Sequence, residues 1–364
     1  MTIINGIEID DIKYVENETK RAIKYNDPIE DNLHVVIVLS NPCGFATRYI
    51  LAREFIKRLQ YERNIVIYIV ELAYGNQDYY ITQKNNSKHL QLRTNENIIW
   101  HKENLINIGI RTLLPKNWKA VAWLDTDIEF DSPSWALDTL KILNGYKDIV
   151  QLFSHTIFMD QNGDTETIFT GLGFQHIKGT KRSTTISKVF SFWHPGFAWA
   201  CNRNMYERMG GLYEYAITGD GDMIMATCII NTYKVLFAEK ISNDYRQTLE
   251  TFEEKVKGSR LGYVPGVIHH HFHGSINSRK YDMRETIIIE YNYSPTIYLD
   301  RDSYGLLVPS AIFPKGLKDS ITNHFKSKNE DSHRKKVESM WPQYATNNTT
   351  NNTCLLYTSP SPRD

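Results

Sequence analysis

The chain has 364 residues, which is long enough for one large domain or two ordinary ones. Lysine plus arginine and aspartate plus glutamate each number 42, so the formal net charge at pH 7 is zero. This balance argues against a general polyanion-binding protein, and we expect no binding to nucleic acid.

The cysteine pattern and the lack of targeting signals predict a reducing, intracellular compartment. The four cysteines, Cys43, Cys201, Cys228 and Cys354, lack the spacing of a zinc site or of a disulfide framework. Residues 1–20 contain no basic region followed by an apolar core, so no signal peptide is seen, and no apolar run is long enough to span a bilayer. We therefore expect a soluble, cytoplasmic protein without a membrane span.

Composition along the chain predicts three regions. Residues 1–30 are polar and charged without a strong period and are predicted to form an N-terminal arm. Residues 31–310 are predicted to form one α/β domain. Residues 311–364 are predicted to be a C-terminal extension, because the apolar pattern thins from about Pro309 and "YATNNTTNNT" is a polar low-complexity tract. The last residues, "CLLYTSPSPRD", resemble translated adapter or vector sequence and carry no functional argument.

The first regular elements predict a β-α-β unit. "LHVVIVLS", from Leu33 to Ser40, is a continuous β-branched run typical of a buried parallel strand. Turn residues then precede an amphipathic helix, and a second buried strand follows in "NIVIYIVELAY". The helix residues predicted to face inward are Ile50, Leu51, Phe55 and Leu59. Such units build a sheet covered by helices.

Four carboxylates follow the next predicted strand. A helix is predicted within residues 95–115, ending near Pro115, and "WKAVAWLDTDIEF" then predicts another interior strand. If this segment stays extended, its acidic side chains lie on one face of the strand. They are Asp125, Asp127, Glu129 and Asp131. Ligands of open α/β sheets bind at the carboxyl ends of the strands.

Asp125 and Asp127 form an Asp-x-Asp pair with two interpretations. Two carboxylates one residue apart can share a hard divalent cation, which prefers oxygen ligands and could hold a diphosphate. The alternative is a solvated acidic turn, since isolated Asp-x-Asp pairs are common. The buried strand directly ahead favours the metal site.

Aromatic residues at the start of the segment from Ser191 to Ala226 could provide a wall for a sugar. Trp193 and Trp199 flank Pro195-Gly196, where a glycine would allow a ligand to approach the backbone closely. We predict Trp193, Gly196 and Trp199 to be substrate-binding residues. The alternative, that most of these aromatics belong to the core, stays open.

Asp220 and Asp222 precede an apolar run that predicts a helix. One of them is explained as a helix N-cap. The other is surplus to capping, and a carboxylate in this position is a candidate general base for a sugar hydroxyl. The sequence does not distinguish the two.

A histidine-rich segment, "HHHFHGSINSRKYDMR", starts at His269. If it is extended, His269, His271 and His273 point to one side and His270 points to the other. Imidazole is a common ligand of divalent transition metals. The basic residues that follow, including Arg279 and Arg284, could bind phosphate oxygens.

In their order along the chain, these motifs resemble glycosyltransferases of the GT-A fold. "DTD" resembles the Asp-x-Asp strand end of that fold. "KENLINIG", from Lys102 to Gly109, and "MGGLYEYAITGDGD" resemble motifs of the galactosyltransferase-like branch. The histidine segment with "HG" is similar to that of uncharacterised glycosyltransferases of phages and large DNA viruses. One departure is that Gly221 separates two aspartates where the related branch has a Glu-Asp pair.

The resemblance implies a fold, an activity and a set of site residues. The fold would be a nucleotide-diphospho-sugar transferase fold, with a Rossmann-like mixed sheet flanked by helices. The activity would be a metal-dependent hexosyl transfer with inversion, from a nucleotide-sugar, with UDP-sugars favoured, to a glycan or another hydroxyl acceptor. Mn²⁺ or Mg²⁺ would bind Asp127, Asp125, and His273 in preference to His271. Donor contacts would come from Asp125, Lys102, Asn107, Arg279 and Arg284, and the base would be Asp220 or Asp222.

Three other functions remain compatible with the sequence. A non-catalytic carbohydrate-binding protein would explain the aromatic residues but needs no diphosphate site. A metal-dependent phosphoesterase would use similar aspartate and histidine clusters, usually around two metals. A nucleotidyltransferase would share the sheet and the metal but would release pyrophosphate.

Overall fold

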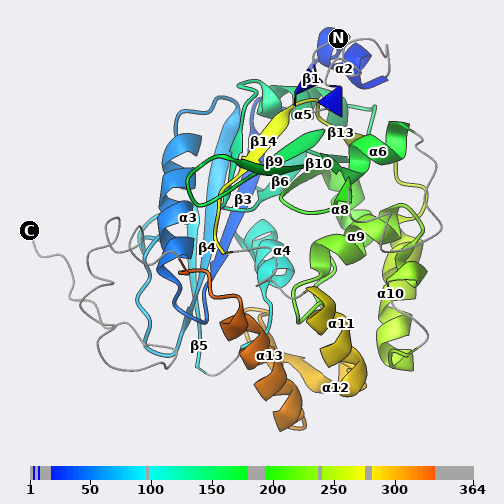
Figure 1. Ribbon diagram of the computed structural model, residues 1–364. Helices are drawn as coiled ribbons and strands as arrows, with labels where there is room; N and C mark the ends of the chain where they lie inside the picture. The colour runs from blue at the N-terminus through cyan, green and yellow to red at the C-terminus, as the bar shows by residue number, and fades with distance from the viewer. Residues whose placement is uncertain are drawn as a thin grey trace, which may run out of the picture.

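A seven-stranded mixed sheet forms the centre of the protein (Figure 1). The computed structural model describes residues 3–4, 7–8, 18–95, 98–178, 193–236, 240–274 and 281–332. The strands of the central sheet are, in spatial order, β13 (Leu261–Tyr263), β8 (Ile149–Gln151), β12 (Ala198–Asn202), β6 (Ala120–Leu124), β3 (Leu33–Ser40), β4 (Ile65–Tyr74) and β5 (His89–Thr94). In this sheet β12 runs antiparallel to both neighbours, and the other pairs are parallel.

A second sheet of five strands carries the histidine segment. Its strands are, in spatial order, β11 (Trp193–His194), β10 (Thr165–Gly171), β9 (His155–Met159), β14 (Val267–His270) and β7 (Ile128–Phe130). Two short pairs complete the described strands: β1 (Ile3–Ile4) with β2 (Ile7–Glu8), and β15 (Leu299–Arg301) with β16 (Leu307–Pro309). β7 follows β6 after the short turn at residues 125–127, so the chain passes directly from the first sheet into the second.

Helices cover both faces of the central sheet, and this explains its continuous apolar strands. On β3, Val35 and Ile37 enter one core while Val36 enters the other, and on β6 the residues alternate in the same way. The first core includes residues of α2 (Glu18–Tyr25), α3 (Ala46–Leu59) and α5 (Trp135–Leu143). The second includes residues of α4 (Lys102–Leu113), α8 (Arg203–Met209), α9 (Gly221–Ile229), α10 (Asn243–Val256), α11 (Tyr281–Glu290) and α13 (Lys315–Ser327). Strands buried on both sides favour uninterrupted apolar residues over alternation.

The remaining described helices are short. They are α6 (Leu172–Lys178), η1 (Tyr233–Val235) and α12 (Pro295–Tyr298). Among all the described helices, none has both the length and the apolar character needed to cross a membrane.

The structure confirms the predicted α/β class and the first β-α-β unit. β3 has the predicted bounds, β4 starts one residue inside its predicted run, and α3 lies between them. The single strand predicted from Trp118 to Phe130 is wrong. The chain turns at residues 125–127, so β6 and β7 are separate strands in different sheets.

Both predicted terminal regions pack against the domain where they are described. Ala22 of α2 is fully buried, and Asn26 donates hydrogen bonds to two backbone carbonyls at the end of α5. Leu317 and Ile321 of α13 are fully buried in the second core. The described residues beyond position 310 therefore contribute to the same hydrophobic core, and the predicted boundary near residue 310 stays a prediction.

Candidate active site

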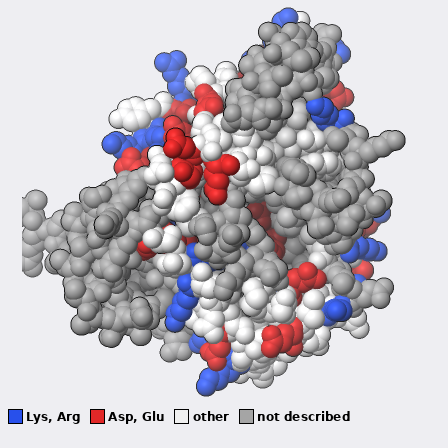
Figure 2. Space-filling model, in the orientation of Figure 1, with Lys and Arg blue, Asp and Glu red and all other residues white. Residues whose placement is uncertain are grey.

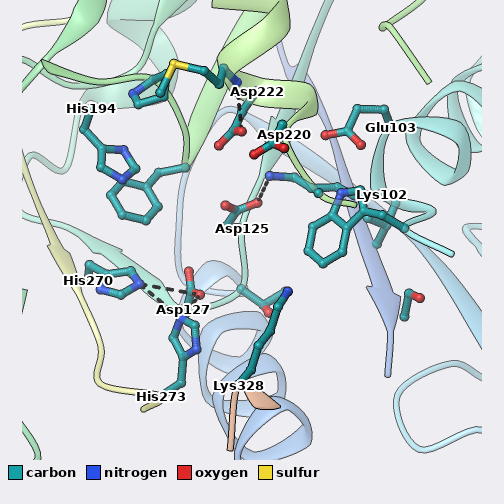
Figure 3. Close-up of a pocket in the computed structure, with 18 of the residues that line it drawn as sticks. Lys102, Glu103, Asp125, Asp127, His194, Asp220, Asp222, His270, His273 and Lys328 are labelled. Carbon is teal, nitrogen blue, oxygen red and sulfur yellow. Dashed lines mark hydrogen bonds and ion pairs between the residues drawn. The ribbon is translucent and has the colours of Figure 1, made fainter. Parts of the chain in front are cut away.

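One large cavity lies at the carboxyl ends of β3 and β6. Its volume is about 940 Å³, and its lining includes the end of β3, the turn after β6, the N-terminal ends of α4 and α9, and the end of β14. On the outer face shown in Figure 2, basic side chains occur in small groups among acidic and uncharged ones. Inside this cavity, carboxylates, imidazoles and ammonium groups converge (Figure 3).

Asp127, His270 and His273 form a group that could hold a metal ion. Their ligand atoms all lie within 4.8 Å of one another. Asp127 Oδ2 lies 3.0 Å from His273 Nε2 and 3.7 Å from His270 Nε2, and these two nitrogens are 3.2 Å apart. Figure 3 shows the three side chains pointing toward one point. Two imidazoles and one carboxylate form a common ligand set for divalent transition metals.

Strand pairing brings the members of this group together. β7 and β14 run antiparallel with His270 opposite Ile128, and the His271 backbone N–H donates to the Asp127 carbonyl at 2.7 Å. The buried Asp127 Oδ1 has no hydrogen-bond partner among the described residues. Burial raises the pKa of Asp127, but His270 and His273 outweigh it and hold that pKa well below its usual range. A buried anionic oxygen without a protein partner fits a bound cation.

His271, predicted as a metal ligand, lies outside this group. His271 Nε2 is 3.3 Å from Glu129, and His269 Nε2 is 3.0 Å from Asp131, so both face away from Asp127. The predicted alternation therefore holds for His269 and His271. It fails for His273, because β14 ends at His270 and the chain turns afterwards. A different turn, at residues 125–127, divides the four carboxylates, so they do not line one face.

Asp125 pairs with Lys102 and is not part of the metal group. Lys102 Nζ lies 2.5 Å from Asp125 Oδ1, and both residues line the cavity. The Asp125 backbone N–H donates to the Phe197 carbonyl at 2.8 Å, which fixes the turn after β6. Burial raises the pKa of Asp125 to about 6, and Lys102 acts against that rise. Asp125 thus contacts α4, outside the group formed by Asp127, His270 and His273, and its predicted metal contact stays a prediction.

Glu103 is a second buried carboxylate that the sequence did not reveal. Its side chain lies against Gly221, where an added Cβ would come within 2.4 Å of Glu103 Oε1. Glu103 is 5% exposed, and burial raises its pKa to about 8, although the neighbouring Lys102 acts in the opposite direction.

The raised pKa of Glu103 predicts a loss of stability as pH rises. Between about pH 4.5 and pH 8 the unfolded chain has lost this proton while the folded chain keeps it, so stability falls across this window. Replacing Glu103 with glutamine removes the titration. We expect E103Q to match the wild type near pH 5 and to be more stable by about 2–4 kcal/mol near pH 8. Urea unfolding at both pH values measures this, with exposed Glu254→Gln as control. An equal difference at both pH values would contradict the prediction.

Asp220 and Asp222 both line the cavity but have different partners. Asp220 occupies the N-cap position of α9 without capping it, and its Oδ1 accepts a hydrogen bond from Arg284 Nη1 at 2.8 Å. Arg284 also donates to the Gly219 carbonyl at 2.6 Å. Asp222 lies in the first turn of α9, and its Oδ1 accepts from the Met223 backbone N–H at 2.8 Å. Asp220 is therefore held by an ion pair, whereas Asp222 accepts a hydrogen bond from the backbone.

Some residues that were predicted to contact the donor or the acceptor contact other parts of the domain. Asn107 is 2% exposed, does not line the cavity, and exchanges hydrogen bonds with the Leu212 backbone at 2.8 and 2.9 Å. Trp199 is 1% exposed and donates its indole N–H to the Pro195 carbonyl at 2.8 Å. Asn107 and Trp199 therefore lie in the packed interior, where hydrogen bonds to the backbone satisfy their polar groups. Arg284 lines the cavity and donates hydrogen bonds to Gly219 and Asp220, and Arg279 lies outside the described residues.

The predicted aromatic wall is only partly present. Trp193 lines the cavity, together with His194, whose ring stacks on Phe197 at a centroid distance of 3.9 Å. Gly196 was predicted to let a ligand approach the backbone, but in the structure the side chain of Asp222 lies against it. An added Cβ there would lie 2.4 Å from Asp222 Oδ2, so the glycine makes room for this carboxylate.

The cavity also contains residues that the sequence analysis did not choose as site residues. They are Arg48, Trp100, Glu103, His194, His270, Lys328 and Glu330. Glu103, His194 and His270 lie inside the predicted motifs, but other residues of those motifs were chosen. Lys328 and Glu330 lie in the region predicted to be an extension, where no pattern pointed to a site.

Comparisons with known proteins give weak likenesses. No family model and no curated protein matches the chain. Among solved structures, the chain is similar to S. aureus TarS 1–349, with 12% identity, a TM-score of 0.33, and coverage of 85% of this chain and 75% of that chain. It is also similar to a protein described as a nucleotide-diphospho-sugar transferase from Desulfovibrio desulfuricans G20, with 10% identity, a TM-score of 0.29, and coverage of 66% and 82%. Likenesses at these TM-scores carry no functional argument.

Proposed function

We propose that the protein is a metal-dependent glycosyltransferase that moves a sugar from a nucleoside-diphosphate donor to an acceptor hydroxyl. One observation carries this proposal: a single cavity holds both a metal-ligand group and a separate carboxylate at a helix N-terminus. Asp127, His270 and His273 suit a cation that binds a diphosphate, and Asp222 suits a base for the acceptor. The order of motifs resembling the galactosyltransferase-like GT-A branch supports the same function, including a UDP-sugar as the favoured donor.

Asp127, His270 and His273 would hold the metal ion. Imidazole ligands suit Mn²⁺ better than Mg²⁺, which prefers oxygen atoms and several waters. When bound, the metal supplies Lewis-acid stabilisation of the negative charge on a leaving diphosphate. The Lys102–Asp125 pair lies beside this group and would fix the turn that positions Asp127.

Asp222 is the better candidate for the general base. Its carboxylate would accept the proton of the acceptor hydroxyl as that oxygen bonds to the anomeric carbon. The bond between this carbon and the diphosphate oxygen breaks in the same step, and the diphosphate leaves with the electron pair. Attack from the face opposite the leaving group inverts the anomeric configuration. Trp193 would lie beside the acceptor sugar, since apolar faces of sugar rings pack on aromatic side chains.

Calorimetric titration of UDP and GDP, with and without Mn²⁺, tests this function. We expect one of the two nucleotides to bind in the presence of Mn²⁺ and binding to fall by at least about tenfold without it. Binding of neither nucleotide in any condition would contradict the proposal. Metal-dependent hydrolysis of nucleotide-sugars without any acceptor requirement would indicate a phosphoesterase. Sugar binding without nucleotide binding would indicate a carbohydrate-binding protein.

A further inference from the structure

The segment from Lys328 to Asp331, here called the C-terminal segment, follows α13 and reaches the cavity. Lys328 lines the cavity although it is only 7% exposed. Its Nζ lies 4.7 Å from the ring centre of Trp100 and 4.8 Å from that of Phe325, so two aromatic faces contact the ammonium group. Figure 3 shows the Lys328 side chain pointing into the cavity.

Lys328 differs from the neighbouring buried cations in its ion pairing. Arg48 pairs with Glu330 at 2.6 Å, and Arg284 pairs with Asp220 at 2.8 Å. Lys328 forms no ion pair with any carboxylate of the described residues. Burial, and then the charges of Arg284 and Arg48, lower the pKa of Lys328 to about 7, although the charge of Glu330 acts in the opposite direction. An ammonium group buried without a direct ion pair is costly, and a bound anion would offset that cost.

Two anchors hold the C-terminal segment in place. Glu330 accepts two hydrogen bonds of 2.6 Å from the Arg48 guanidinium. Asp331 accepts from the backbone N–H groups of Ala46 and Thr47 at 3.0 Å, and from the Thr47 hydroxyl at 2.7 Å. Asp331 thus satisfies free N–H groups at the start of α3. These contacts fix the backbone close to Lys328, so the lysine is presented by a rigid support.

The segment also touches the histidine segment beside the metal group. Glu330 Oε2 lies 3.9 Å from His273 Nδ1. Gly274 has a φ of +100°, and an added Cβ there would lie 3.2 Å from the Lys328 carbonyl oxygen. The close backbone approach therefore depends on a glycine directly after His273. Lys328 and the metal group consequently belong to one continuous wall of the cavity.

We infer that Lys328 binds a phosphate group of the donor, as a cation that the C-terminal segment supplies to the site. The identity of the ligand as a nucleoside diphosphate rests on the proposed function. The anion site itself does not, because inorganic pyrophosphate carries the same charged groups. Lys328 would then keep its proton when the anion is bound, since a nearby negative charge raises the pKa of an ammonium group.

The test compares Lys328→Gln with Lys326→Gln, which removes an exposed charge two residues away. Calorimetry measures binding of inorganic pyrophosphate without metal, and of UDP and GDP with Mn²⁺. We expect K328Q to weaken pyrophosphate binding by about 10–100-fold and K326Q to change it by less than about twofold. Lys328→Met is a second variant at this position. A thermal midpoint at or above that of the wild type shows that K328Q or K328M is folded.

The two proposals fail in different ways. If the wild type binds a nucleoside diphosphate with Mn²⁺ and K328Q binds it equally well, the inference on Lys328 is wrong and the proposed function stands. If the wild type binds pyrophosphate through Lys328 but binds neither nucleotide, the anion site stands and the proposed function fails. If the wild type binds none of the three, both are wrong.

Discussion

Replacing Asp127 with alanine is expected to abolish Mn²⁺-dependent binding of the nucleoside diphosphate. Asp127 is the carboxylate of the metal group, and its buried Oδ1 has no hydrogen-bond partner among the described residues, which leaves it available to a cation. His270→Ala and His273→Ala remove the other ligands. Mutating a residue that only supports a ligand costs about 10–100-fold in metal affinity, so loss of a ligand is expected to cost at least about 100-fold. Mn²⁺ titration followed by electron paramagnetic resonance measures this directly.

His271→Ala is the matched control for the histidine variants. It removes an imidazole from the same segment, but His271 faces Glu129, so Mn²⁺ affinity is expected to change by less than about twofold. The opposite pattern, with H271A losing the metal and H270A retaining it, would show that the alternation predicted from the sequence is right and that the observed grouping is wrong. D127A with unchanged Mn²⁺ affinity would exclude this group as the metal site.

The sequence predicted those parts of the site that follow directly from regular structure. β3, α3 and β4 were predictable because strands buried on both faces and an amphipathic helix leave distinct apolar patterns. Asp127, Asp220 and Asp222 were predicted to be site residues because each follows a strand or begins a helix, where chain direction alone limits where a side chain can point. Their presence in the cavity agrees with that argument, and their catalytic roles remain predictions.

The errors in the predicted site have physical causes that a sequence does not show. His270 was placed opposite His273 because alternation was assumed beyond His270, where β14 ends. Asn107 and Trp199 were predicted to bind ligands, yet a buried amide or indole can be satisfied by the backbone of a neighbouring segment. Such contacts join residues up to 105 positions apart in the chain. Lys328 was missed for a similar reason, since its approach depends on anchors on α3.

Replacing Asp222 with asparagine is expected to lower kcat by about 10²–10⁴-fold and to leave binding of the donor nucleotide nearly unchanged. Asparagine keeps the size of the side chain but cannot accept the proton of the acceptor hydroxyl. Asp222 lies on α9, whereas the metal group lies on the turn after β6 and on the segment after β14, so the two functions are separable. Steady-state kinetics with a responsive donor and acceptor, together with nucleotide titration, measures both quantities.

Asp220→Asn separates the two candidate bases, because Asp220 is engaged by Arg284 at 2.8 Å. Removing its charge leaves a largely buried guanidinium without its partner, so D220N is expected to lower the thermal midpoint. The D222N variant should instead keep the wild-type midpoint and lose turnover. A D220N variant that melts like the wild type but loses turnover, beside an active D222N, would transfer the role of base to Asp220. A product that retains the donor's anomeric configuration would exclude both carboxylates as the base of a direct displacement, because that displacement requires attack from the face opposite the leaving group.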